Sequence, residues 1–164
     1  MNHPSISKRN PDANIHSVDE LMSMEKIVEM LIVDNNACND KSYTTLDLSS
    51  FANLKVLEVG DYSCSFVKTV ELIGLNQLER VMIGKNTFSK WDRDDENPNC
   101  HFYLKNCPKV KELRIGCCSF SVYSLCGIES DDSLEVIKIG ELGKWSNTFK
   151  YASLELRSEI DEMK

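Results

Sequence analysis

Four segments of the chain share one pattern of apolar and polar positions. Each has an apolar residue at its first, fourth and sixth positions and glycine at its seventh. The segments are 54–60, 78–84, 110–116 and 134–140, and their starts lie 24, 32 and 24 residues apart. A weaker fifth copy, 27–33, ends in valine instead of glycine. Apolar residues at alternate positions predict a short strand with one buried face.

A second apolar pair recurs before each of these segments. The pairs are Leu46/Leu48, Val70/Leu72, Phe102/Leu104 and Cys126/Ile128, and Leu154/Leu156 continues the series. The second member always lies six positions before the start of the next segment, whereas the first member lies 10 to 18 positions after the preceding glycine. Insertions confined to one corner are typical of stacked repeats. The pattern therefore predicts a β-rich α/β fold, a solenoid of about five stacked coils with short parallel strands.

The repeat resembles the leucine-rich repeat family, whose pattern is Leu-x-x-Leu-x-Leu-x-x-Asn-x-Leu. The segment from Leu78 to Phe88 matches this pattern position for position. Cys118 takes the asparagine position in the next copy, a substitution that the family accepts. Looser matches and departures are Ile27, Met30, Ile32, Asn35 and Ala37 in the first copy, Tyr62 and Leu142 at the asparagine position, and Lys144 at an apolar one. The Ile-Gly-x-x-x-Phe ending is similar to irregular repeats of some protist and bacterial surface proteins. The resemblance implies a leucine-rich-repeat-like right-handed solenoid.

The pattern also divides the chain. We expect a flexible N-terminal arm over 1–16, because this stretch is polar and contains two prolines. Ser17 and Glu20 have the spacing of a capping box, which predicts a capping helix within 17–26. The leucine-rich-repeat-like solenoid covers 27–156, and a polar tail follows over 157–164. Because solenoids need polar caps, the uncapped C-terminal coil predicts end-to-end association or a longer repeat array.

Composition and charge restrict the function. The net charge is −7 and no basic block is present, which argues against nucleic-acid binding. Because no apolar run approaches the roughly 20 residues of a membrane helix, we expect no membrane insertion. The first residues show no secretory signal, so we expect a cytoplasmic location.

Candidate chemistry is sparse. The seven cysteines show neither zinc-ligand nor disulfide spacing, so we expect reduced core residues. Cys100 and His101 are adjacent, and neighbours in an extended chain point to opposite sides, which disfavours a nucleophile and its base. Asp92, Asp94 and Glu96 alternate as in a calcium loop, but Asn97 stands where that loop requires glycine. We therefore expect no catalytic residue, metal or cofactor, and no enzyme.

The most informative inference is geometric. The third and fifth positions of each segment point away from the core, so stacking forms two columns on one sheet face. The fifth positions are Leu31, Glu58, Met82, Arg114 and Lys138; the third positions are Glu29, Val56, Arg80, Glu112 and Val136. Methionine and arginine are enriched at protein interfaces. The candidate partner-binding face is therefore Glu58, Arg80, Met82, Glu112, Arg114 and Lys138, and Trp91 is a candidate anchor in the long loop.

These observations favour a nonenzymatic protein–protein interaction module with an unknown protein partner. The alternative is a structural segment or fragment of a larger repeat protein that has no binding site of its own. An ordinary solvated sheet, with Arg80 and Glu112 paired across neighbouring strands, would fit that alternative.

Overall fold

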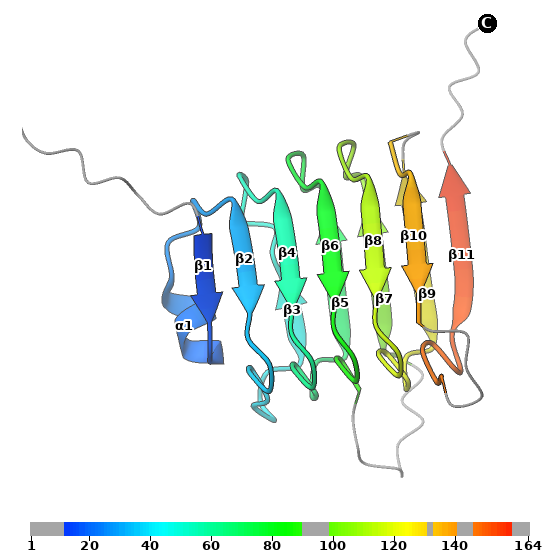
Figure 1. Cartoon of the computed structure of the whole chain (residues 1–164), viewed down its shortest axis with the longest axis horizontal. Coiled ribbons are helices and arrows are strands. Elements are labelled where there is room, and N and C mark those ends of the chain that lie inside the picture. The colour runs from blue at the N-terminus through cyan, green and yellow to red at the C-terminus, as the bar shows by residue number, and fades with distance from the viewer. Residues whose placement is uncertain (1–11, 90–98, 131–132, 141–145, 159–164) are drawn as a thin grey trace, which may run out of the picture.

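The computed structural model describes residues 12–89, 99–130, 133–140 and 146–158, which build two all-parallel sheets (Figure 1). Sheet A has the strand order β1 (Asp12–Ile15), β2 (Met30–Val33), β4 (Val56–Val59), β6 (Arg80–Ile83), β8 (Glu112–Ile115), β10 (Val136–Ile139). Sheet B has the order β11 (Ser153–Ser158), β9 (Leu125–Ser130), β7 (His101–Lys105), β5 (Thr69–Ile73), β3 (Thr45–Asp47). The short helix α1 (Val18–Ser23) lies between β1 and β2 in sequence.

From β2 onward the chain alternates strictly between the two sheets, so one sheet A strand and the sheet B strand after it form a repeat unit. Strands of the two sheets run in opposite directions, as β10 and β11 show in Figure 1. Both predicted series of apolar positions are therefore strands. This confirms the expected β-rich architecture of short parallel strands.

The core lies between the two sheets. In each central strand, buried and outward side chains alternate, as the period of two predicts. Leu57, Val81 and Leu113 occupy equivalent places in sheet A and are 0% exposed. Leu72 and Leu104 face them from sheet B and are equally buried. One strand cannot enclose an apolar face alone, so this core exists only because neighbouring units stack.

The turns after β4, β6, β8 and β10 are held by a column of hydroxyl groups, which are buried in the first three turns and half-buried in the last. Each hydroxyl donates a hydrogen bond to a backbone carbonyl of the preceding unit. The pairs, with their oxygen–oxygen distances, are Ser63 to Asp34 (2.7 Å), Thr87 to Gly60 (2.7 Å), Ser119 to Gly84 (2.6 Å) and Thr148 to Gly116 (3.1 Å). We call this column the hydroxyl ladder. Ser63, Thr87 and Ser119 each come directly after the position at which the resemblance leads us to expect asparagine.

The glycines that end three sheet A strands allow neighbouring turns to approach closely. A Cβ atom on Gly84 would lie 2.5 Å from Asp61 Oδ1 and 2.7 Å from the Asp61 backbone nitrogen. On Gly116 it would lie 2.5 Å from the carbonyl oxygen of Gly84. Neither glycine has a positive φ, so close approach explains these residues and backbone conformation does not.

An aromatic column fills the core beside the hydroxyl ladder. The rings of Phe88, Phe120 and Phe149 stack in order, with successive centroids 4.8 Å apart. The amide of Phe149 donates to the carbonyl of Ser119, just as the Phe120 amide donates to Thr87 one unit earlier. The ungapped sequence pattern assigned this apolar position to Lys144, and that assignment is wrong. The extra residues after Gly140 shift the position to Phe149.

The first copy of the repeat is displaced by one residue from its predicted register. Strand β2 pairs Leu31 with Leu57 and Val33 with Val59. Val28, Leu31 and Val33 are buried, whereas Ile27 is 40% exposed. The prediction that Ile27 and its partners at the fourth and sixth positions face the core is therefore wrong. Every residue in this stretch except Glu29 is apolar, so hydrophobic periodicity alone fits both registers.

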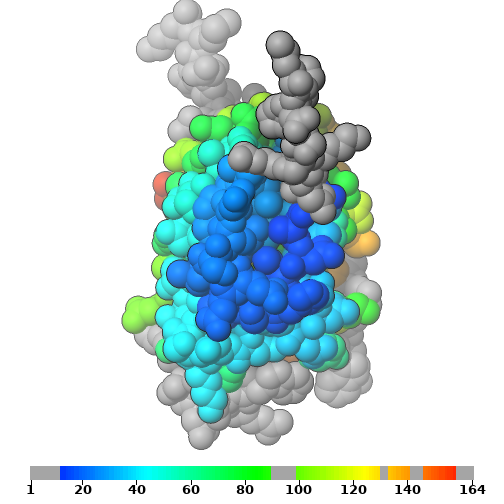
Figure 2. Space-filling view, turned by 90° about the vertical axis from the view of Figure 1, so that its left-hand side faces the viewer, coloured from blue at the N-terminus to red at the C-terminus, as the bar shows by residue number. Residues whose placement is uncertain are grey.

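The N-terminal end of the two sheets is closed by β1 and α1. Strand β1 extends sheet A by pairing with β2, so residues 12–15 are not the flexible arm expected over 1–16; residues 1–11 lie outside the described part. The helix confirms the capping-box prediction, because Ser17 Oγ accepts from the Glu20 amide at 3.3 Å, but it ends at Ser23. Ile15 and Leu21 close the core, each 3% exposed, and Figure 2 views this covered end.

The C-terminal end of the two sheets differs from the N-terminal end in the exposure of its apolar side chains. Strand β11 continues to Ser158, so its last residues belong to sheet B instead of the expected polar tail. Leu154 and Leu156 keep the core register but are 54% and 58% exposed. Within the described residues, no helix is long and apolar enough to cross a membrane.

Candidate functional site

The outer face of sheet A carries the predicted columns. The strand register places Arg80 beside Glu112, and Met82 beside Arg114. Glu58 precedes Met82 in the same column, and Lys138 follows Arg114. The structure thus brings all six predicted face residues onto one sheet surface, in the order that the sequence repeat implies.

The first unit changes the two columns. Because β2 is displaced by one residue, Ile32 pairs with Glu58 and Met30 pairs with Val56. Leu31, which the sequence placed on the outer face, is 0% exposed and belongs to the core. Ile32 and Met30 are half-buried on the outer face, so this end of the sheet surface is more apolar than predicted.

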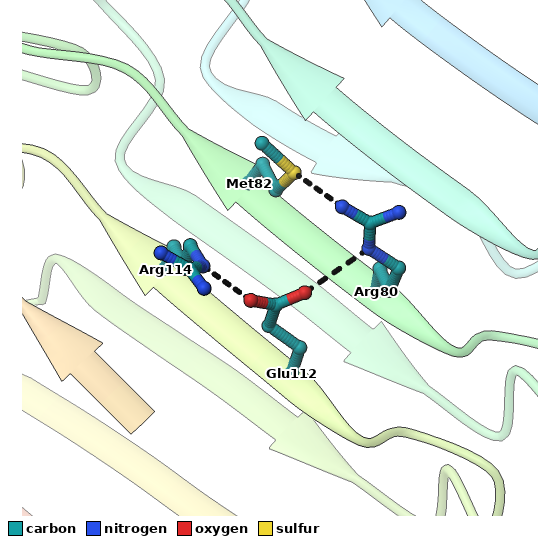
Figure 3. Close-up of polar contacts among 4 residues, drawn as sticks. All are labelled: Arg80, Met82, Glu112 and Arg114. Carbon is teal, nitrogen blue, oxygen red and sulfur yellow. Dashed lines mark hydrogen bonds and ion pairs between the residues drawn. The ribbon is translucent and has the colours of Figure 1, made fainter. Parts of the chain in front are cut away.

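A cluster of side chains with opposite charges crosses β6 and β8 (Figure 3). The Arg80 guanidinium donates through Nε to Glu112 Oε2 at 3.1 Å and through Nη2 to Met82 Sδ at 3.4 Å. Arg114 Nε donates to the other oxygen of the same carboxylate. Hydrogen bonding to Arg114, with the attraction of Arg114 and Arg80, holds the pKa of Glu112 below its ordinary value of 4.5. Glu112 therefore contacts both arginines, and Arg80 also contacts the thioether.

Next to this cluster the face is hollowed. A pocket of about 520 Å³ lies over the ends of β2, β4 and β6, at the turns that carry Gly60 and Gly84. Its outward-facing walls are Ile32, Glu58, Met82 and Arg114; Val33, Asp34, Asn35, Val59 and Ile83 complete the lining. The volume lies within the range of small-ligand sites, and the walls combine apolar and charged groups.

The charged side chains around the hollow differ in whether they have an ion-pair partner. The Arg114 guanidinium already contacts the Glu112 carboxylate. Glu58 is half-buried and forms no ion pair with any other described residue. Asp34 contacts His16, with 2.5 Å between Oδ2 and Nδ1, and His16 is charged only when protonated. The hollow therefore places Glu58, a carboxylate without an ion-pair partner among the described residues, beside the apolar side chains of Ile32 and Met82.

The remaining predicted residues have different places. Lys138 lies on the same face but does not line the hollow, and Arg80 and Glu112 lie beside it. Trp91 lies outside the described residues. Sequence reasoning missed Ile32, Asp34 and Asn35. The signal that could have found them is the cysteine shared by the turns Asp34–Cys38 and Gly60–Cys64, which fixes the correct register.

The outer face of sheet B is organised differently. His101 Nε2 lies 3.0 Å from Glu71 Oε1, and the His101 ring packs against Tyr103 with 4.6 Å between centroids. A Cβ atom on Gly127 would meet the Tyr103 ring at 2.7 Å, so this ring covers the glycine. Cys100 is 2% exposed. These contacts are structural, and among the described residues no group of His, Cys, Asp and Glu could hold a metal ion.

The cysteines lie mainly in the core. Cys38, Cys64 and Cys126 are buried, free thiols. Burial raises the pKa of Cys126 to about 12, so its thiol stays protonated at neutral pH. A hydrogen bond from the Cys64 thiol lowers the pKa of Cys38. Cys38 and Cys64 occupy the column position that Phe88 and Phe120 take in later units.

Comparison with protein-family models, curated proteins and solved structures gives no match to this chain.

Proposed function

We propose that the chain is a leucine-rich-repeat-like right-handed solenoid that acts as a nonenzymatic protein-interaction module, and that it binds its partner on the outer face of sheet A. The observation that carries this proposal is the hollow lined by Ile32, Glu58, Met82 and Arg114. Three of these residues belong to the face that the repeat pattern singles out. Solenoids commonly use the exposed face of their stacked strands for binding.

The chemistry of the hollow indicates what the partner presents. Ile32 and Met82 offer an apolar surface, and methionine adapts its shape to different side chains. Glu58 supplies a carboxylate that forms no ion pair with any other described residue. The partner is therefore a polypeptide segment that places an apolar side chain in the hollow and a lysine or arginine beside Glu58. Such a charged contact contributes to specificity and association rate.

A matched pair of charge reversals tests this proposal. Glu58→Lys changes the hollow, and Glu71→Lys makes the same charge change on the outer face of sheet B. The two variants and the unaltered chain are used as baits in a lysate of the source cells, and the bound proteins are identified by mass spectrometry. Circular dichroism verifies that each bait is folded. We expect Glu71→Lys to retain a partner that Glu58→Lys loses.

The alternative function, a structural segment of a larger repeat protein without a binding site of its own, gives a different result. In that case the three baits bind the same proteins equally well. This outcome would reject binding at the hollow, because circular dichroism verifies that both charge-reversal baits are folded.

A further inference from the structure

The C-terminal end of the two sheets exposes side chains that hold core positions. Ile137 pairs in register with Leu113, and Leu156 pairs with Ile128. Leu113 and Ile128 are 0% and 2% exposed, whereas Ile137 and Leu156 are 43% and 58% exposed. Leu154, on the same strand as Leu156, is 54% exposed. The apolar layer between the sheets is therefore open at this end.

Two strand edges border this open layer. β10 is the last strand of sheet A and β11 is the last strand of sheet B, and they lie at the same end in Figure 1. Among the described residues, no strand pairs with the outer edge of either one. Unpaired edges with apolar side chains readily pair with another chain, and monomeric proteins normally cover or charge them.

The N-terminal end cannot supply the missing layer. Helix α1 and strand β1 cover that end (Figure 2). Their side chains Leu21 and Ile15 are buried. A second copy stacked head to tail would place its helix against the open layer instead of a pair of strands. When the C-terminal ends of two copies meet, strands pack against strands and the helix takes no part. The two copies then form a closed pair related by a two-fold axis.

The sequence of β11 is complementary to itself in such a pair. A two-fold axis normal to the sheets makes the two copies of β11 antiparallel. When the axis passes Leu156, Glu155 of one copy lies opposite Arg157 of the other, and the same pairing occurs again by symmetry. Both charged residues are exposed on the outer face of sheet B, and within one copy Arg157 Nη2 lies 3.7 Å from Glu155 Oε2. Leu156 then meets Leu156 of the second copy on the inner face.

We propose that the chain forms a two-fold homodimer through β10 and β11, in which the two β11 strands pair antiparallel about Leu156. The dimer joins the two apolar layers into one core and pairs the edges of both sheets. This inference goes beyond the proposed function, because it uses the end of the sheets and leaves the hollow on the sheet A face free.

Light scattering coupled to size exclusion, together with sedimentation equilibrium, tests the dimer. The unaltered chain is expected to have the mass of two copies. Leu156→Lys places a charge in the joined core and is expected to yield a monomer with an unchanged circular dichroism spectrum. Met22→Lys is the matched control, because Met22 is 66% exposed at the other end, and it retains the dimer. A monomeric unaltered chain, an open-ended assembly, or a dimer that survives Leu156→Lys overturns the proposal.

A charge exchange tests the register. Glu155→Arg places two arginines opposite each other at both symmetric positions, so we expect the dimer dissociation constant to rise about fivefold or more. Adding Arg157→Glu reverses both members of each pair and restores the dimer. If the double variant dissociates as readily as Glu155→Arg, the antiparallel register about Leu156 is wrong. Glu58→Lys leaves the dimer intact, so failure of the dimer and failure of the proposed function are distinguishable.

Discussion

The phenyl ring of Phe149 lies flat on that of Phe120, with centroids 4.8 Å apart and planes inclined by 2°. Phe88 stacks on the opposite side of Phe120. The ring of Tyr123 forms an edge-to-face contact with the ring of Phe120, at an interplanar angle of 82°. Phe120 thus connects three consecutive units through one side chain. Its removal would leave a cavity that none of these rings can fill without leaving its own column.

We therefore expect Phe120→Ala to lower the free energy of unfolding by about 3–5 kcal/mol. Tyr151→Ala is the control, because Tyr151 is 61% exposed and its loss should change stability by less than about 0.5 kcal/mol. Urea denaturation followed by circular dichroism measures both values. Equal midpoints for the two variants would show that the aromatic column is not part of the core.

The register of β2 can be tested with neighbouring residues. Leu31 is 0% exposed, whereas Ile32 lies on the outer face. Leu31→Ala should destabilise the fold by about 2–5 kcal/mol, since it removes buried methyl groups and leaves a cavity. Ile32→Ala should have a much smaller effect, because its side chain is only half-buried. The opposite order of denaturation midpoints would restore the register that the sequence pattern suggested.

The close approach of turns at Gly84 gives a third prediction. Gly84→Ala inserts a methyl group that would lie 2.7 Å from the Asp61 backbone nitrogen, and backbone atoms at that distance must move apart. We expect a loss of about 1–3 kcal/mol, as for other overpacked sites. Lys85→Ala, at the exposed next residue, should be nearly neutral. Thermal unfolding of the two variants compares them directly, and a neutral Gly84→Ala would mean that the turns separate easily.

Tyr123 makes stability depend on alkaline pH. Its phenol is 0% exposed and donates to the carbonyl of Val67 at 2.7 Å. Burial raises its pKa well above the ordinary value of 10.0, so the folded protein holds the phenolic proton more tightly than the unfolded chain does. This stabilisation is complete below pH 10.0 and is lost as the pH rises from there through the folded-state pKa.

We therefore expect Tyr123→Phe to lose less stability than the unaltered chain between neutral and strongly alkaline pH. At neutral pH the variant should be less stable by about 1 kcal/mol, because it lacks one hydrogen bond. Denaturant titrations at two pH values provide the measurement, with Tyr151→Phe as the exposed control. Identical pH dependence in all three proteins would show that Tyr123 is not the group responsible.

The repeat made most of the sheet arrangement predictable, because Leu57, Val81 and Leu113 recur at one position and each has at least one charged neighbour. The prediction of the buried face failed where apolar residues occupy both faces of a strand. The stretch around Leu31 is apolar on both faces, so only contacts between turns determine which face is buried. Phe149 was missed because a repeat template without gaps cannot locate an insertion within a turn.

The candidate site was predictable to a similar degree. Alternation placed Glu58, Met82 and Arg114 on one face, and the strand register agrees. The hollow was not predictable, because it depends on where the turns at Gly60 and Gly84 end relative to the strands. Strand β1 also escaped the sequence analysis, since four residues with one buried side chain carry almost no periodic signal.

The hydroxyl ladder gives the molecule a direction of assembly. Ser63, Thr87 and Ser119 each donate to a carbonyl of the unit before their own. A newly synthesised unit thus finds its acceptor on a turn that has already left the ribosome, because chains emerge N-terminus first. Each finished turn serves as a template for the next one. Folding can then advance during translation from the helix-covered end, one unit at a time.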